Sequence, residues 1–79
     1  MEIIVFGSGC KKCEDLVNNC QEIVNDKKIV ATVRKVTDIN EMINHGVLFT
    51  PALMINDKIV ISGKVPTRKT LENRILSEV

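Results

Sequence analysis

The sequence has very few aromatic residues and almost no net charge. Of its 79 residues only Phe6 and Phe49 are aromatic, and tryptophan and tyrosine are absent. Its 11 basic and 10 acidic side chains leave a formal net charge of +1. A nucleic-acid-binding surface needs clustered positive charge or aromatic rings that stack on bases. The composition therefore gives no reason to expect a nucleic-acid partner.

Long hydrophobic runs and export signals are also missing. No apolar run approaches the roughly 20 residues that a membrane-spanning helix needs. Met1 and Glu2 lead directly into a short apolar run, without the basic segment and small-residue cleavage site of a signal peptide. We therefore expect a cytoplasmic monomer without a membrane partner, folded as one domain over residues 1–79.

Cysteine is scarce, and its three occurrences are an odd number in a chain without an export signal. This argues against a structural disulfide scaffold. Cys10 and Cys13 form a Cys-x-x-Cys motif, which near a strand–helix–strand pattern indicates redox or metal chemistry. Cys20 lies ~10 Å along the expected helix from Cys13, too far for a disulfide within it. Because Cys20 falls between apolar positions, we expect it in the core.

The Cys10–Cys13 motif lies where a strand turns into a helix. Residues 2–6 are an apolar run rich in branched side chains, which is typical of a buried strand. From Cys13 onward, apolar residues recur at helical spacing. The free N–H groups of the first helical turn and the helix dipole favour a thiolate on Cys10. We expect Gly7 and Gly9 to let the backbone turn sharply and leave this sulfur uncovered.

The two cysteines differ in their expected chemistry. Cys13 begins the apolar stripe of the helix, so we interpret Cys10 as the exposed nucleophile and Cys13 as the resolving thiol. The Cys10 thiolate attacks a substrate disulfide, and Cys13 then releases the substrate and leaves a Cys10–Cys13 disulfide. We expect a pKa for Cys10 below the free-thiol value of about 8.5. Lys11 and Lys12 contribute less, because exposed charges are screened within about 10 Å.

The whole pattern predicts an α/β fold with the order βαβαββα and a four-stranded mixed sheet flanked by helices. Two strand–helix–strand connections predict parallel strand pairs. Asn56 and Asp57 between two apolar runs predict a β-hairpin. The expected strands cover residues 2–6, 29–36, 52–55 and 58–61, and the expected helices cover residues 11–26, about 38–44, and the segment after residue 67.

Capping residues define the two shorter helices. Asp38, three residues before Glu41, predicts the start of the middle helix, and Gly46 predicts its end. Thr67 predicts the start of the last helix. His45 is the only histidine, and we expect it at a helix C-terminus instead of in catalysis. The side chains expected to face inward from these helices are Ile39, Met42, Ile43, Leu71, Ile75, Leu76 and Val79.

These features together resemble small thioredoxin-fold proteins, and most of all the compact, glutaredoxin-sized redox-active disulfide proteins of prokaryotes. The resemblance rests on the motif Cys10-Lys11-Lys12-Cys13 after an apolar strand, on Thr50-Pro51 before the third strand, and on the element order. It implies a cis peptide bond before Pro51, beside the Cys pair. It also implies that the backbone of Thr50 and Pro51 docks an extended substrate and that Gly63 borders the substrate groove.

The resemblance implies a thiol–disulfide oxidoreductase that reduces protein disulfides without a cofactor and is recycled by a reductase. Several positions depart from thioredoxins. Thioredoxins carry a tryptophan before the first cysteine and Gly-Pro between the two cysteines, where this chain has Gly9 and Lys11-Lys12. They also carry a buried aspartate beneath the Cys pair, where this chain has only the apolar run Ile3-Ile4-Val5.

Two alternative functions fit the Cys pair. Small metallochaperones place a Cys-x-x-Cys between a strand and a helix, and two thiolates suit Cu(I) or Zn. Those carriers have a methionine where this chain has Ser8, and they end on a strand instead of a helix, so we assign no metal ligands. The other alternative is a thiol sensor or interaction module whose disulfide only changes its shape.

Overall fold

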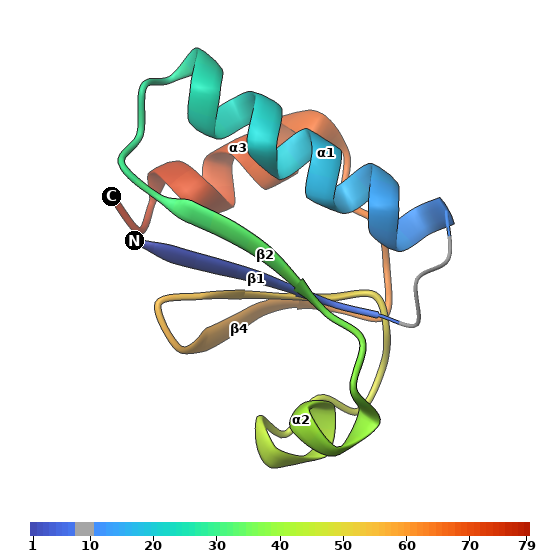
Figure 1. Cartoon of the computed structure of the whole chain (residues 1–79). Helices are drawn as coiled ribbons and strands as arrows, with labels where there is room; N and C mark the ends of the chain where they lie inside the picture. The colour runs from blue at the N-terminus through green and yellow to red at the C-terminus, as the bar shows by residue number, and fades with distance from the viewer. Residues whose placement is uncertain (8–10) are drawn as a thin grey trace.

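A four-stranded sheet with strand order β2-β1-β3-β4 forms the centre of the fold (Figure 1). The computed structural model describes residues 1–7 and 11–79. Strands β1 and β2 are parallel, whereas β3 is antiparallel to both β1 and β4. The strands are β1 (Glu2–Phe6), β2 (Thr32–Val36), β3 (Ala52–Ile55) and β4 (Lys58–Ser62), and the helices are α1 (Lys11–Asp26), α2 (Ile39–Asn44) and α3 (Arg68–Leu76).

The helices lie on both faces of this sheet. Helices α1 and α3 cover one face, and the short helix α2 lies on the other (Figure 1). Because successive side chains of a strand point to opposite faces, β1 and β3 supply both layers. Ile3, Val5, Leu53 and Ile55 pack toward α1 and α3, and Ile4, Phe6, Ala52 and Met54 join the cluster around α2. The fold class predicted from the sequence is therefore confirmed.

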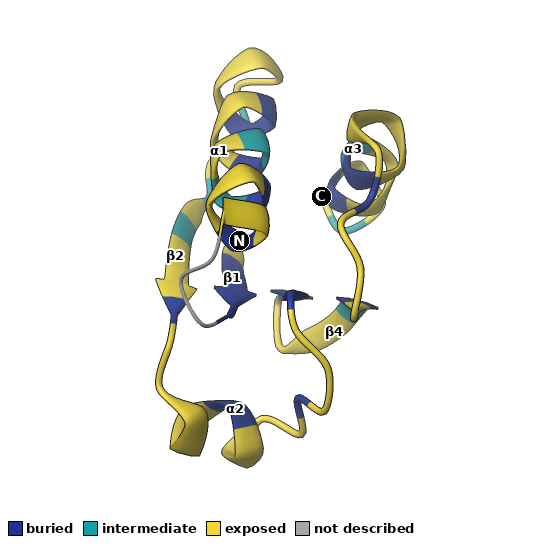
Figure 2. Cartoon of the chain, turned by 90° about the vertical axis from the view of Figure 1, so that its right-hand side faces the viewer, coloured by how far each residue is buried: buried dark blue, intermediate teal, exposed yellow. Residues whose placement is uncertain are grey.

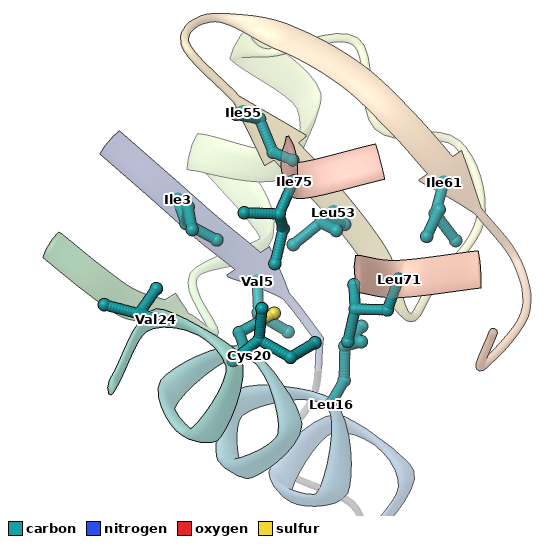
Figure 3. Packing of buried hydrophobic residues seen from close by; sticks show 11 residues of the cluster. Ile3, Val5, Leu16, Cys20, Val24, Leu53, Ile55, Ile61, Leu71 and Ile75 are labelled. Atoms are coloured by element: carbon teal, nitrogen blue, oxygen red, sulfur yellow. The ribbon is translucent and has the colours of Figure 1, made fainter. Parts of the chain in front are cut away.

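The larger core lies between the sheet and helices α1 and α3 (Figure 3). Leu16, Cys20 and Ile23 of α1 are fully buried there, together with Leu71 and Ile75 of α3. Their spacing repeats every three or four residues, which places them on one face of each helix. Cys20 is therefore a core residue, as predicted.

Several local predictions are confirmed. The Asp38 carboxylate accepts a hydrogen bond of 2.8 Å from the Asn40 backbone N–H and caps α2. Gly46 follows that helix with a positive φ of 76°. Thr67 caps α3 through a 3.2 Å bond from the Thr70 N–H. The hairpin residues Asn56 and Asp57 both have positive φ, as a primed turn requires.

The second strand was predicted to start too early. Residues 29–31 are not part of β2, which begins at Thr32, level with Glu2 of β1. Helix α1 ends through a turn in which Lys28 has a φ of 53° and the Ile29 N–H donates to the Val24 carbonyl at 3.0 Å. In the parallel register, Thr32 pairs with Glu2, the first residue of β1. Residues 29–31 lie before this point and have no residue of β1 opposite them.

The prediction of a second parallel strand pair was wrong. Strand β3 begins at Ala52, level with the last residue of β1, Phe6. Helix α2 has only six residues, which span roughly 9 Å, whereas returning along a five-residue strand requires about 16 Å. The chain therefore re-enters the sheet at the end where β2 left it, and β3 runs antiparallel.

Four of the predicted inward-facing side chains lie at the surface. Of the apolar residues of α2, Met42 is buried, whereas Ile39 and Ile43 are 68% and 66% exposed. In Figure 2 most of this helix is exposed. Leu76, the last residue of α3, and Val79, after its end, are also exposed. Among the described residues, no helix is long and apolar enough to cross a membrane.

Candidate functional site at the end of strand β1

The site is built where β1 ends and α1 begins. Gly7 continues the pairing of β1 with β2, because its N–H donates to the Val36 carbonyl at 3.0 Å. We expected Gly7 and Gly9 to let the backbone turn sharply; the φ of Gly7 is not in the positive region, and Gly9 lies outside the described residues. Cys10, the predicted nucleophile, lies outside the described residues.

Cys13 lies on the first turn of α1 with its sulfur directed at Gly7. A Cβ atom added to Gly7 would overlap the Cys13 sulfur and come within 2.9 Å of the Cys13 Cβ. The Cys13 side chain is only 1% exposed. Cys13 is therefore part of the buried face of α1, as its place at the start of the apolar stripe predicted, whereas its role as resolving thiol stays a prediction.

Thr50 and Pro51 lie at the same edge of the sheet. Ala52 is the register partner of Phe6, so Pro51 stands level with Gly7 one step further along. The Thr50–Pro51 peptide bond is cis, as the family resemblance implies. Pro51 is buried, whereas Thr50 is exposed. The structure therefore brings Pro51 and the Cys13 side of the Cys motif to one edge, although they are distant in sequence.

Gly63 closes this edge from the loop after β4. Its N–H donates to the Pro51 carbonyl at 2.9 Å. It has a φ of 79°, a backbone conformation that favours glycine, and an added Cβ would lie 3.1 Å from the Cβ of Phe49. Gly63 thus connects the β4 loop to the segment that carries Thr50 and Pro51.

The charged and ionisable residues that the sequence suggested for the site lie near the end of β1. Lys11 and Lys12 are exposed on the first turn of α1. His45 is the C-terminal cap of α2, and its ring lies 5.4 Å from the ring of buried Phe6. Among the described residues, no polar or charged side chain is buried. The part of the site that the structure describes therefore contains no buried carboxylate.

An apolar hollow beside Thr50 was missed by the sequence analysis. It has a volume of about 420 Å³ and is lined by residues that include Ile39, Met42, Ile43, Val47, Leu48 and Thr50. Leu48 in this lining and its chain neighbour Phe49 are exposed. The only signal in the sequence was the apolar spacing of α2, which we interpreted as a buried face.

A model of the thioredoxin domain family matches residues 1–76. The chain belongs to the thioredoxin family. A thioredoxin of Methanocaldococcus jannaschii is 37% identical over 75 residues, which cover 95% of this chain and 86% of that protein. A thioredoxin of Methanothermobacter thermautotrophicus is 29% identical over 77 residues, covering 98% of this chain and 99% of that one.

The fold is also that of a thioredoxin in solved structures. The germline-specific thioredoxin Deadhead of Drosophila melanogaster has a crystal structure that aligns with a TM-score of 0.67. The alignment covers 99% of this chain and 80% of that chain, at 15% sequence identity. At this identity the likeness concerns the fold alone.

Family membership supports one of the three functions considered from the sequence, the thiol–disulfide oxidoreductase. The thioredoxin domain is a thiol–disulfide oxidoreductase, and its substrates are protein disulfides. The comparisons give no support to the metal-carrier alternative.

Proposed function

We propose that Cys10 and Cys13 are the redox-active pair of this thioredoxin and that residues 1–79 act as one catalytic domain. One observation carries the proposal: the buried Cys13 sulfur and the buried Pro51 lie at the same end of β1, from which the chain continues to Cys10. The Cys-x-x-Cys spacing and the membership of the family support it.

The proposed reaction has two thiol–disulfide exchange steps. First, the Cys10 thiolate attacks one sulfur of a substrate disulfide, forming a mixed disulfide and expelling the second substrate sulfur as a thiolate. Second, the Cys13 sulfur attacks the Cys10 sulfur, forming the Cys10–Cys13 disulfide and expelling the first substrate sulfur. The substrate takes up two electrons and two protons, and the protein dithiol loses them.

The second step requires a proton acceptor for Cys13. No buried carboxylate is present in the described part of the chain. The substrate thiolate released in the first step is a base that the reaction itself provides. We propose that this thiolate accepts the Cys13 proton.

We propose that the substrate docks along Thr50, Pro51 and Gly63. An extended peptide can hydrogen-bond to exposed backbone in the manner of an added strand. The apolar hollow beside Thr50 is open to the solvent side of α2, where Ile39 and Ile43 are exposed. It offers a place for an apolar side chain of the same substrate.

The proposal also covers the location of the protein, its oligomeric state, its recycling and the charges beside Cys10. We propose a cytoplasmic monomer that needs no cofactor and is recycled by a separate reductase, because the chain belongs to the thioredoxin family. Lys11 and Lys12 are proposed to stabilise the Cys10 thiolate weakly, after the larger contribution of the helix N-terminus.

Trapping of the mixed disulfide tests the assignment. With a protein disulfide such as insulin, the Cys13→Ser variant should accumulate a covalent adduct on Cys10, because the second step is blocked. The Cys10→Ser variant should form no adduct. If Cys13→Ser forms none either, the exchange mechanism is wrong and a thiol sensor becomes the better explanation.

An equilibrium redox titration tests the pair independently. The reduced and oxidised forms are separated by alkylation and mass spectrometry over a range of potentials. We expect one two-electron transition, assigned to Cys10 and Cys13, with Cys20 remaining a thiol throughout. A potential near or below about −270 mV would make the protein a disulfide reductase, whereas one above about −200 mV would indicate an oxidant or a glutathione-linked role.

A further inference from the structure

At Gly7 the fold leaves no space for a side chain. An added Cβ would overlap the Cys13 sulfur and lie 2.9 Å from the Cys13 Cβ, and real Cβ atoms essentially never approach closer than 3.0 Å. The other described glycines differ from it. Gly46 and Gly63 have positive φ, and an added Cβ at Gly46 would meet nothing within 4 Å. At Gly7, space is the requirement instead of backbone torsion.

Neither backbone segment at this contact can move away easily. Gly7 is held to the sheet by its 3.0 Å hydrogen bond to the Val36 carbonyl, and Phe6 before it is fully buried. On the opposite side, Leu16 and Cys20 fix α1 in the core directly after Cys13. Because interiors are close-packed, a shift of the helix or the strand would disturb many contacts. A larger residue at position 7 would therefore displace the Cys13 side chain.

We propose that Gly7 is a positioning residue for the resolving thiol: its missing side chain provides the space in which the Cys13 sulfur is held for its attack on Cys10. This inference rests on the proposed roles of Cys10 and Cys13. Disulfide formation accepts only a narrow range of Cα and Cβ separations and torsions. A sulfur pushed out of this space is therefore poorly placed for the second step. The first step does not use Cys13 and should be spared.

Rapid acid quenching of the Gly7→Ala variant separates the two steps. After mixing the reduced variant with insulin, we expect the mixed disulfide on Cys10 to form at nearly the wild-type rate. Its resolution should slow by roughly tenfold to a hundredfold, as misplacement of a reacting group by about 1 Å does. The adduct should therefore accumulate in the variant. If resolution is as fast as in the wild-type protein, Gly7 does not position Cys13.

The reduction potential of the Cys10–Cys13 pair provides a second test of the positioning role. The Cys10–Cys13 disulfide should become easier to reduce in Gly7→Ala, because a displaced Cys13 strains the closed form. A tenfold fall in the equilibrium constant for disulfide formation corresponds to a potential about 30 mV less negative. An unchanged potential would mean that Gly7→Ala affects only general packing and not the geometry of the Cys10–Cys13 pair.

A stability cycle keeps the proposal testable if Gly7→Ala folds poorly. The free energy of unfolding is compared with and without Gly7→Ala in three backgrounds: wild type, Cys13→Ala and Cys20→Ala. The cost of Gly7→Ala should be smaller in Cys13→Ala, because the overlapping sulfur is gone; the remaining Cβ makes this relief partial. It should be undiminished in Cys20→Ala, which removes the other buried thiol of α1.

These outcomes separate the inference from the function on which it rests. Folding of Gly7→Ala only in the Cys13→Ala background would support the inference, and equal costs in all three backgrounds would overturn it. A wild-type protein that forms no Cys10–Cys13 disulfide would overturn the proposed function and the positioning role together. Normal wild-type turnover with unchanged resolution in Gly7→Ala would overturn the positioning role alone.

Discussion

Cys13 and Cys20 lie on the same face of α1, yet their surroundings differ. Cys13 is on the first turn against Gly7, at the end of β1. Cys20 is two turns further along, inside the core between the sheet and helices α1 and α3 (Figure 3). Burial raises the pKa of Cys20 from 9.0 to about 12. A thiol that stays protonated and covered is chemically inert, so the two residues serve different purposes.

The raised pKa of Cys20 predicts a loss of stability at alkaline pH. Below pH 9 the thiol is protonated in both states and pH has no effect through this group. Between pH 9 and 12 the unfolded chain loses the proton while the native protein keeps it, so stability falls as pH rises. The expected loss is on the order of 1 kcal/mol at pH 10. Urea denaturation of the reduced protein at pH 8 and pH 10 measures it.

The Cys20→Ala variant is the matched control for this effect. It should be less stable than wild type at pH 8 because it leaves a small cavity. Its additional loss between pH 8 and pH 10 should be smaller than that of wild type by the contribution of the Cys20 thiol. Equal losses in the two proteins would show that Cys20 does not titrate in this way.

Replacing Lys11 and Lys12 together by glutamine should change the pKa of Cys10 only slightly. Both side chains are exposed, so their charges are screened by solvent and salt. We expect a shift well under about 1 unit, upward because two positive charges are lost. The pH dependence of the alkylation rate, measured in a Cys13→Ser and Cys20→Ala background, gives this value. A shift larger than that would assign the main stabilisation of the thiolate to the lysines.

At the scale of elements, α2 is the least anchored part of the fold. It has six residues, one of which is buried, and it covers its face of the sheet mainly through Met42 and the following Val47. Helix α1 is instead fixed by five buried residues. Arg68 at the start of α3 adds hydrogen bonds of 2.8 Å to Glu22 and Asp26 of α1. The two faces of the sheet therefore differ in how firmly they are covered.

The cap of α2 should matter because so little else holds this helix. In the Asp38→Ala variant the Asn40 N–H loses its 2.8 Å partner, and we expect about 1 kcal/mol of destabilisation by urea denaturation. Asp38→Asn retains an oxygen at the same place and should cost much less. If alanine and asparagine cost the same, the carboxylate oxygen does not cap the helix.

The molecule as a whole is organised around two strands that are buried on both faces. All residues of β3 and four of the five residues of β1 are buried. Each strand contacts the α1 and α3 layer with one set of side chains and the α2 layer with the other. The site at the end of β1 therefore stands on the most firmly held part of the molecule.

This arrangement predicts a gradient of amide hydrogen exchange. Amides of β1 and β3 should exchange only through global unfolding, because no local opening releases strands that are covered on both faces. Amides of α2 should exchange faster, through local opening. Exchange measured residue by residue by NMR in increasing denaturant tests this, and slow global exchange across α2 would contradict it.

Local sequence signals predicted most of the elements correctly. The apolar runs of β1 and β3 and the stripe of α1 are periodic over enough residues to be unambiguous. The caps Asp38 and Thr67 and the hairpin residues Asn56 and Asp57 act through bonds and torsions within a few residues. Such features depend little on distant parts of the chain. The element order that they predict was one of the three grounds for the resemblance to the thioredoxin fold, beside the Cys motif and Thr50-Pro51.

By itself, therefore, the sequence determined the order of elements, the family, and the assignment of Cys20 to the core. Tertiary structure alone decided the direction of β3, the exposure of Ile39 and Ile43, and the contact between Gly7 and the Cys13 sulfur. Each of these depends on how two segments distant in sequence meet, or on which apolar face remains uncovered. Periodicity within one segment reports which side chains share a face, but not what lies opposite that face.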